Sequence, residues 1–234
     1  MTDVTSDEHN LTVIDLGRMD YASALGVQLR AVEWVKAGRE TPARPEFLLL
    51  VEHDPPVITV GRGGDQQNIR HSRDALGAQG VELHESSRGG DVTYHGPGQL
   101  VVYPIIDLAQ HGRDVHRYLR DLEETVIRLL GRYDLDGRRD PDYTGVWIGR
   151  EKVCAIGVAI TRWVTYHGVA LNVTTDLDRF DLIVPCGIHD RGVTSLATLL
   201  GRDVKLKSVA TDFVATFAEV FGFAAVTEAP PDGI

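Results

Sequence analysis

The segment KVCAIGVAITRWVTYHGVALNV, residues 152–173, decides the fold that the sequence predicts. It contains two runs rich in β-branched and small apolar residues, at 152–160 and 165–173, with only residues 161–164 between them. Runs of this composition are typical of strands, and a connection this short joins antiparallel neighbours. The segment therefore predicts a long antiparallel hairpin within a larger sheet.

The rest of the chain supplies further strands and three amphipathic helices. Short β-branched runs predict strands at 47–51, 57–60, 100–106 and 146–148. Apolar residues recur at helical spacing over 21–36, 114–130 and 208–221, with Asp114 and Ser208 placed as N-caps. This mixture predicts an α/β (α+β) fold in which helices flank a mixed β-sheet. We expect a single domain over residues 11–226 and flexible termini at 1–10 and 227–234, which offer little apolar surface.

Charge and cysteine content narrow the class of protein. The 234 residues include 24 Lys and Arg against 34 Asp and Glu, a net charge of −10, which argues against general binding to a nucleic-acid backbone. Two cysteines, Cys154 and Cys186, are too few for a disulfide framework and fit a reducing compartment. The polar, acidic start and the absence of an apolar run near ~20 residues lead us to expect a soluble cytoplasmic protein.

A glycine-rich segment, RGGDVTYHGPGQL at residues 88–100, is the first candidate site. Its glycines allow tight turns and let a ligand approach the main chain closely. The spacing matches neither the phosphate loop nor the dinucleotide-binding fingerprint. A mononucleotide site stays open, but a narrow slot lined by backbone fits the segment better.

Cys186, in the segment IVPCGI, is the candidate reactive thiol, because it follows an apolar, strand-like run and sits between a proline and a glycine. Cys154 lies inside an apolar strand and is expected to be core. A free thiol is mostly protonated at neutral pH, so a nucleophilic cysteine needs a nearby cation or base. Lys152 could fill that role, and so could His95 or His167. The residues alone leave the Cys–Lys and Cys–His pairs open.

These segments, in the same order along the chain, resemble the octanoyltransferases of lipoate synthesis, the lipoate-protein ligase B type. The resemblance runs from about Leu48 to Leu200 and includes HDPPVITVGRGG at 53–64 and GVTSL at 192–196. It implies a biotin/lipoate protein ligase-like fold. It also implies transfer of an octanoyl group from octanoyl-acyl carrier protein to a lysine of a lipoyl domain, without a metal ion or other cofactor. Implied acceptors are 2-oxoacid dehydrogenase subunits and the glycine cleavage H protein.

The resemblance also assigns roles to individual residues. Cys186 matches the nucleophile that carries the acyl group as a thioester, and Lys152 matches the lysine that lowers the thiol's pKa and relays protons. The substrate-lining positions are Arg88, Gly89, Gly90, Asp91, Val92, Thr93, Tyr94 and His95, together with Ala155, Ile156, Gly157, Gly168, Val169 and Ala170.

Physical requirements of this reaction add four expectations. Partial burial should lower the pKa of Lys152, so that it can act as a base. Backbone N–H groups near Cys186 should form an oxyanion hole. An apolar groove for the acyl chain should come from Ile156, Val158, Val169 and Leu171. Docking of acidic partner proteins on an acidic enzyme should need local positive charge, for which the candidates are Arg62, Arg70, Arg73, Arg88, Arg138 and Arg139.

Three other functions remain in competition. An ATP-dependent lipoate or biotin ligase on the same fold would activate a free acid and would need no thiol. A binding protein would sequester acyl groups or lipoyl domains without turnover. An amidotransferase would move acyl groups between lipoyl proteins and would use an octanoylated H protein as its donor.

Overall fold

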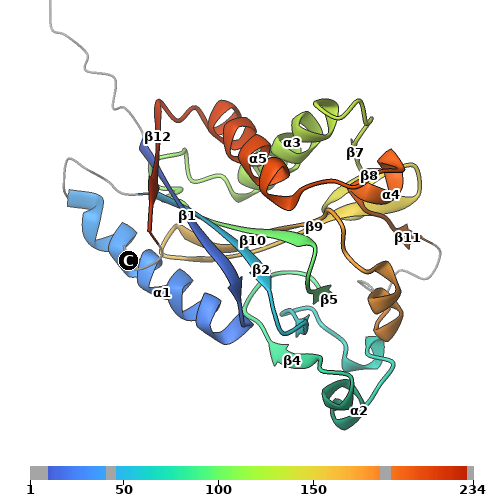
Figure 1. The fold of residues 1–234 in the computed structure, drawn as a ribbon. Coiled ribbons are helices and arrows are strands. Elements are labelled where there is room, and N and C mark those ends of the chain that lie inside the picture. The colour runs from blue at the N-terminus through green and yellow to red at the C-terminus, as the bar shows by residue number, and fades with distance from the viewer. Residues whose placement is uncertain (1–9, 41–45, 185–190, 231–234) are drawn as a thin grey trace, which may run out of the picture.

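A large mixed sheet forms the centre of the protein (Figure 1). The computed structural model describes residues 10–40, 46–184 and 191–230. The strand order is β12 (Ala225–Ala229), β1 (Asn10–Met19), β2 (Glu46–His53), β6 (Gln99–Ile105), β10 (Val164–Asn172), β9 (Glu151–Thr161), β8 (Val146–Ile148) and β7 (Arg138–Arg139). The short β11 (Gly192–Val193) also pairs with β9. Parallel pairing at β12–β1–β2 and antiparallel pairing from β2 to β7 confirm the predicted mixed sheet.

The predicted hairpin is present as β9 and β10. Its ladder places Gly157 opposite Gly168 and Ile156 opposite Val169. At the turn, Arg162 and Trp163 adopt positive φ angles of 48° and 70°, the backbone sign that a tight hairpin turn with matching twist requires. The other predicted strands correspond to β2, β3 (Val57–Val60), β6 and β8.

Helices cover both faces of the large sheet. Helix α1 (Tyr21–Ala37) lies on one face, and α3 (Val115–Gly131) and α5 (Leu206–Phe221) lie together on the other (Figure 1). The Asp114 side chain caps α3 as predicted, accepting a hydrogen bond from the Arg117 N–H. Ser208 as the N-cap of the last helix is wrong, because α5 begins at Leu206 and Lys205 occupies the cap position without a side-chain hydrogen bond.

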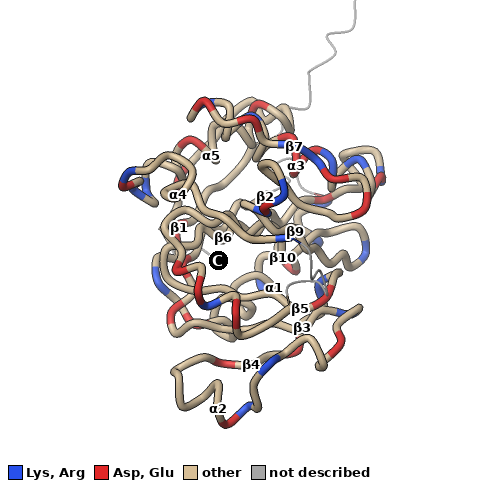
Figure 2. The backbone as a smooth tube through the Cα atoms, turned by 90° about the vertical axis from the view of Figure 1, so that its right-hand side faces the viewer, with Lys and Arg blue, Asp and Glu red and all other residues tan. Residues whose placement is uncertain are grey.

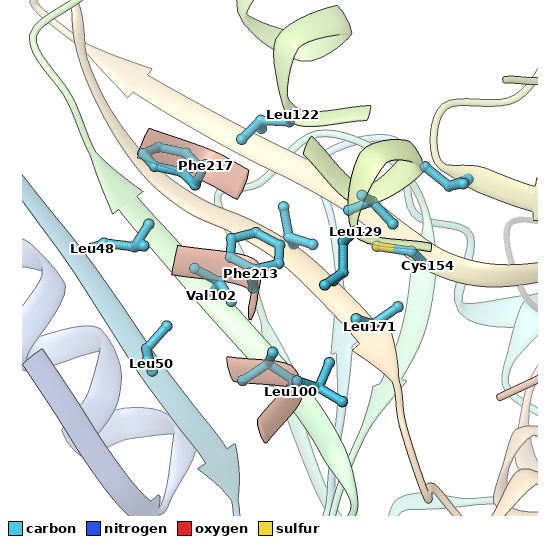
Figure 3. Close-up of a cluster of buried hydrophobic side chains, with 14 of the residues drawn as sticks. Leu48, Leu50, Leu100, Val102, Leu122, Leu129, Cys154, Leu171, Phe213 and Phe217 are labelled. Atoms are coloured by element: carbon cyan, nitrogen blue, oxygen red, sulfur yellow. The ribbon is translucent and has the colours of Figure 1, made fainter. Parts of the chain in front are cut away.

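Two apolar clusters follow from this layering. One lies between the sheet and helices α3 and α5, and contains Leu48, Val102, Leu171 and Phe213 (Figure 3). The other lies beneath α1 and contains Ala24, Val101, Tyr103 and Ala170. Side chains alternate between the two clusters along β6 and β10, as the period of two in a strand requires.

A second, smaller sheet lies beside the large one, in the strand order β4 (Glu82–Glu85), β3, β5 (Val92–His95). Helix α2 (Arg73–Ala78) precedes β4 in the chain. A third apolar cluster joins Tyr94 of β5 to Phe180 and Ile183. The remaining helical turns are η1 (Gly38–Glu40), η2 (Gln66–Asn68), η3 (Leu177–Leu182) and α4 (Leu196–Leu200).

Two expectations need correction. Thr227 to Ala229 do not form part of a frayed end: they belong to β12, where Thr227 pairs with Thr12 in parallel register, as Asn10 does with Ala225. Backbone pairing, not burial of apolar side chains, holds this strand, so composition did not reveal it. The apolar run before Cys186 is not a strand either. It follows η3, and Ile183 makes a single antiparallel bridge to Ile69.

None of the helices in the described parts of the chain combines the length and apolar character needed to span a bilayer.

Candidate active site

A cavity of about 580 Å³ opens between the two sheets. Its walls come from β9 and β10 on the large sheet, from β3 and β5 on the small one, and from the loop that includes Arg88 to Asp91. Its size falls in the range of small-molecule sites in proteins. Of the fourteen substrate-lining positions expected from sequence, the cavity brings together twelve: Arg88, Gly89, Gly90, Asp91, Thr93, His95, Ala155, Ile156, Gly157, Gly168, Val169 and Ala170.

The two remaining positions, Val92 and Tyr94, point away from the cavity. Both lie on β5, where side chains alternate between the faces of the small sheet. Thr93 and His95 therefore face the cavity, while Val92 and Tyr94 are buried in the third apolar cluster. Tyr94 packs there edge-on against Phe180, with ring centroids 5.4 Å apart.

Two glycines on the hairpin allow close backbone approach, Gly157 to the glycine-rich loop and Gly168 to β6. A Cβ atom on Gly157 would lie 3.0 Å from the Gly89 carbonyl oxygen, and one on Gly168 would lie 2.4 Å from the Val102 carbonyl oxygen. The Gly89 N–H donates a hydrogen bond of 2.8 Å to the Val158 carbonyl. The loop is thus fixed to the strand by its backbone, as the sequence predicted for a slot with main-chain walls.

Arg88 is buried at the cavity wall and fixes this loop to the small sheet. Its Nε and Nη2 atoms donate to the Thr59 hydroxyl at 3.1 and 2.8 Å, and Nη2 also donates to the Thr59 carbonyl at 2.7 Å. Nη1 donates to the Gly89 carbonyl at 3.0 Å. The guanidinium is therefore an internal structural group and not a surface charge for a partner protein.

Two histidines line the cavity, and burial keeps both neutral. His95 donates from Nδ1 to the Gln99 side-chain oxygen at 2.8 Å, and Gln99 in turn donates to Asn172 at 2.9 Å. Burial lowers the pKa of His95 well below its ordinary value and that of His167 to about 3. Burial therefore disfavours the charged form of both histidines.

Lys152 provides a cation at the same cavity. It is 8% exposed, and its Nζ donates to the Thr144 carbonyl at 3.3 Å and lies 4.7 Å from the centroid of the Trp147 ring. Backbone pairing places Val193 of β11 beside Lys152, and the Thr194 N–H donates to the Lys152 carbonyl at 3.0 Å. The chain that follows Cys186 thus returns to the large sheet at Lys152.

Cys186 itself lies outside the described residues, as do its neighbours in 185–190, and the oxyanion hole expected there falls on the same segment. The described flanks are held on both sides. The Val184 N–H donates to the Asn68 carbonyl at 2.7 Å. Arg191 forms an ion pair with Asp140, and its guanidinium lies over the Tyr143 and Trp147 rings.

Cys154 is core, as predicted. It is fully buried in the cluster beneath α3 and α5 (Figure 3), and desolvation raises the pKa of its thiol. Leu171, expected in the acyl groove, lies in the same cluster and not on the cavity. The other three groove candidates, Ile156, Val158 and Val169, do line the cavity.

The proposed docking arginines divide into two groups. Arg138 pairs with Asp136, Arg139 pairs with Glu123 and Glu124, and basic and acidic positions lie close together around α3 and β7 (Figure 2). Arg138 and Arg139 are exposed but already paired with acidic neighbours, whereas Arg88 is buried. Arg62, Arg70 and Arg73 are exposed, and Arg62 precedes the cavity residue Gly63.

Sequence reasoning missed several cavity residues that come from distant elements. They are Tyr21, Thr59, Gly63, Val101, Tyr103, Val115, Leu119, Asp142, Tyr143 and Thr144. Most resemble ordinary core or loop positions. Thr59 and Gly63 lie in the HDPPVITVGRGG stretch that resembles the family. The TGVW stretch at 144–147 carried a second signal, because a glycine before an apolar strand indicates a turn with unusual backbone geometry.

Comparison with known proteins agrees with this architecture. The lipoyl protein ligase A/B catalytic domain family matches residues 20–218. An octanoyltransferase of Rubrobacter xylanophilus is 51% identical over 208 residues, covering 88% of this chain and 91% of the relative. An octanoyltransferase of Geobacter metallireducens is 45% identical over 225 residues, covering 94% of this chain and all (100%) of the relative.

Solved structures with lower identity share the fold. A bipartite lipoate protein ligase of Thermoplasma acidophilum superimposes with a TM-score of 0.72 at 18% identity, covering 95% of this chain and 87% of the other. A lipoate-protein ligase A bound with ATP gives a TM-score of 0.71 at 18% identity, with 95% and 89% covered. These likenesses confirm the predicted lipoate ligase-like fold. From the family match and the close relatives, the chain belongs to the lipoyl protein ligase A/B catalytic domain family, among its octanoyltransferases.

Proposed function

We propose that this protein moves an octanoyl group from octanoyl-acyl carrier protein to a lysine of a lipoyl domain, through a thioester on Cys186. The observation that carries the proposal is the position of Lys152: a buried lysine whose ammonium group faces a cavity of ligand size. The strand that follows Cys186 pairs directly with it. A cation at that point is what a cysteine nucleophile requires.

The first step forms the acyl-enzyme. In the resting enzyme the thiol proton of Cys186 already lies on Lys152, and the thiolate of this ion pair attacks the thioester carbonyl of the donor. The carbon–sulfur bond to the carrier breaks, and the departing carrier thiolate takes the proton back from Lys152. One thioester replaces another, so this step is nearly balanced in free energy and needs no ATP.

The second step makes the amide. The neutral amine of the acceptor lysine attacks the acyl-enzyme, and Lys152 accepts the proton that the nitrogen loses. Cys186 departs as a thiolate, which restores the starting ion pair. Since an amide is more stable than a thioester, this step runs downhill and drives the sequence forward.

The cavity offers the acyl chain an apolar wall on β9 and β10, built by Ile156, Val158 and Val169. Burial of each methylene there contributes about 0.8 kcal/mol. The exposed arginines Arg62, Arg70 and Arg73 are the docking candidates for an acidic carrier protein. The acceptor class is supported by the Thermoplasma acidophilum ligase, which belongs to a lipoylation system with an E2 lipoyl domain.

Intact-mass spectrometry tests this function directly. After incubation with octanoyl-acyl carrier protein, the protein should gain one octanoyl group. We expect the adduct to disappear in Cys186→Ser and to persist in the matched variant Cys154→Ser. An adduct that depends on Cys154 would overturn the assignment of the nucleophile.

The fold shared with an ATP-bound lipoate-protein ligase A keeps one alternative worth testing, an ATP-dependent ligase. Such an enzyme would modify a lipoyl domain with free octanoate and ATP, and Cys186→Ser would leave that reaction intact. We expect no ATP-dependent transfer. Modification of lipoyl domain in excess over enzyme would exclude a simple binding protein, and an octanoylated H protein as the better donor would indicate an amidotransferase.

A further inference from the structure

Helix α3 buries a carboxylate that the mechanism above does not use. Glu123 is fully buried, and its Oε2 atom accepts a hydrogen bond of 2.7 Å from Arg120 and lies 3.2 Å from Nε of Arg139. Its other oxygen, Oε1, accepts a hydrogen bond of 3.2 Å from the Gly145 N–H. A buried carboxylate is costly unless its oxygens are satisfied, and here one oxygen is directed at a main-chain amide.

The peptide between Thr144 and Gly145 connects Glu123 to Lys152. In a trans peptide the N–H and the C=O point in opposite directions and turn as one rigid plane. The N–H of this plane points to Glu123, and its carbonyl, on Thr144, accepts the hydrogen bond from Lys152 Nζ at 3.3 Å. A group that fixes the direction of the Gly145 N–H therefore also fixes the direction of the Thr144 carbonyl.

Gly145 makes this orientation of the peptide possible, but another group must fix it. Its φ is +126°, a region that side-chain-bearing residues rarely adopt, and a Cβ there would lie 2.5 Å from the Cys154 carbonyl oxygen. Glycine at this position permits the conformation without enforcing it. The hydrogen bond to the Glu123 carboxylate fixes the orientation of the peptide. Charge-assisted hydrogen bonds are stronger than those between neutral groups.

We propose that Glu123 is a positioning residue for Lys152: it holds the Thr144–Gly145 peptide so that the Thr144 carbonyl keeps the Lys152 ammonium group at the cavity. Arg120 and Arg139 satisfy the second oxygen of Glu123 and leave Oε1 directed at the peptide. Glu123 itself does not line the cavity. The inference rests on the proposed catalytic role of Lys152 and adds the group that orients it.

Substitutions at Glu123 and its neighbour separate this role from general stability. Glu123→Leu removes the acceptor without leaving a large cavity, and we expect kcat to fall about tenfold or more, the cost of misplacing a catalytic group. The KM for the donor should stay within about twofold, because the cavity walls are untouched. Glu123→Gln keeps an oxygen that can accept from Gly145 and should restore kcat to within about threefold. Glu124→Leu is the control, since Glu124 also pairs with Arg139 but does not contact Gly145.

Glu123→Asp keeps the inference testable if Glu123→Leu does not fold. It retains the charge but is one methylene too short to reach both the arginines and Gly145, so kcat should fall several-fold. Wild-type kcat in the folded Leu variant, or in Asp, would overturn the inference. A Gln variant as slow as Leu would also overturn it, because charge rather than the peptide hydrogen bond would then be responsible.

A double-mutant cycle distinguishes failure of this inference from failure of the proposed function. If Glu123 acts through Lys152, adding Glu123→Leu to Lys152→Met should reduce the residual rate by less than about twofold. Effects that multiply independently would contradict the inference while leaving Lys152 catalytic. A Lys152→Met enzyme with the wild-type rate would instead refute the catalytic role of Lys152 on which the inference rests, whereas a wild-type protein that forms no octanoyl adduct would refute the proposed function.

Discussion

Lys152 and Cys154 lie two residues apart on β9, and their surroundings are opposite in character. In a regular strand, residues at this spacing share one face. Here Lys152 faces the cavity, whereas Cys154 is buried in the apolar cluster beneath α3 and α5 (Figure 3). The difference comes from pairing with β8, in which Trp147 faces Lys152 and the adjacent Val146 faces Cys154.

This pairing is a β-bulge, with one extra residue on β9. Val153 and Cys154 both enter the core, and Lys152, just before them in the bulge, lines the cavity. A bulge of this kind re-aims a side chain without interrupting the sheet. One irregular position thus converts the start of a core strand into the wall of a site.

Lys152 and Cys154 consequently differ in chemical role. Desolvation raises the pKa of the Cys154 thiol, so that it stays protonated and inert. Lys152 keeps the Thr144 carbonyl and the Trp147 ring as polar and aromatic partners for its ammonium group. Chemistry is therefore assigned to Lys152 and packing to Cys154, although both residues belong to the same strand.

The largest effect should follow from removing the amine on the cavity side. Lys152→Met keeps the length of the side chain but removes the proton acceptor, and we expect the rate of octanoyl transfer to fall about 10²- to 10⁴-fold, the usual contribution of a general base. Cys154→Ala, on the core side, should keep the transfer rate within about twofold and lower only thermal stability. Single-turnover transfer from octanoyl-acyl carrier protein measures the first effect, and thermal unfolding measures the second. A larger loss of rate in Cys154→Ala would break the division between the two sides.

Much of this architecture was predictable because it repeats along the chain. The β9–β10 hairpin followed from two apolar runs and a short connection, and helix α3 followed from periodic leucines after Asp114. Cavity residues in the glycine-rich loop were also predictable, since their backbone requirements appear in the residue types themselves. Cys154 was recognised as core from its apolar neighbours.

Features that depend on tertiary pairing were not predictable. The bulge beside Val146 depends on β8, and nothing within the 152–160 run distinguishes it from a regular strand. Val92 and Tyr94 were grouped with Thr93 and His95 as site residues, because a motif does not show which face of a strand each side chain takes. Strand β12 is held by main-chain pairing to β1 and has little apolar character to detect.

Acid should destabilise the fold through two buried histidines, His167 on the cavity wall and His53 at the end of β2. Burial lowers the pKa of His53 to about 4 and that of His167 to about 3, against about 6.5 in an unfolded chain. Their contribution to stability is therefore complete above pH 6.5 and is lost as the pH falls, because the unfolded state takes up protons that the folded state refuses. At pH 5 each histidine should cost up to about 2 kcal/mol.

Urea unfolding at pH 7 and pH 5 measures this loss. Replacing His167 with glutamine should reduce the difference between the two pH values, whereas replacing the exposed His71 should not. Equal pH dependence in all three proteins would mean that burial in the cavity wall does not hold His167 neutral.

The smallest effect should come from a single methylene on the cavity wall. Ile156→Val removes one carbon from the wall proposed for the acyl chain, and about 0.8 kcal/mol of lost burial corresponds to a KM for the donor about fourfold higher. Ile14→Val removes the same carbon from a fully buried site beneath α1 and should leave that KM unchanged while lowering the free energy of unfolding by about 1 kcal/mol. Which quantity changes, the KM for the donor or the free energy of unfolding, matters more than the size of the change. Only a residue that contacts the octanoyl chain can change donor binding without a matching loss of stability. If Ile156→Val alters stability alone, the acyl chain must follow another wall of the cavity, and the remaining candidates are the side chains that Tyr21, Tyr103 and Leu119 contribute.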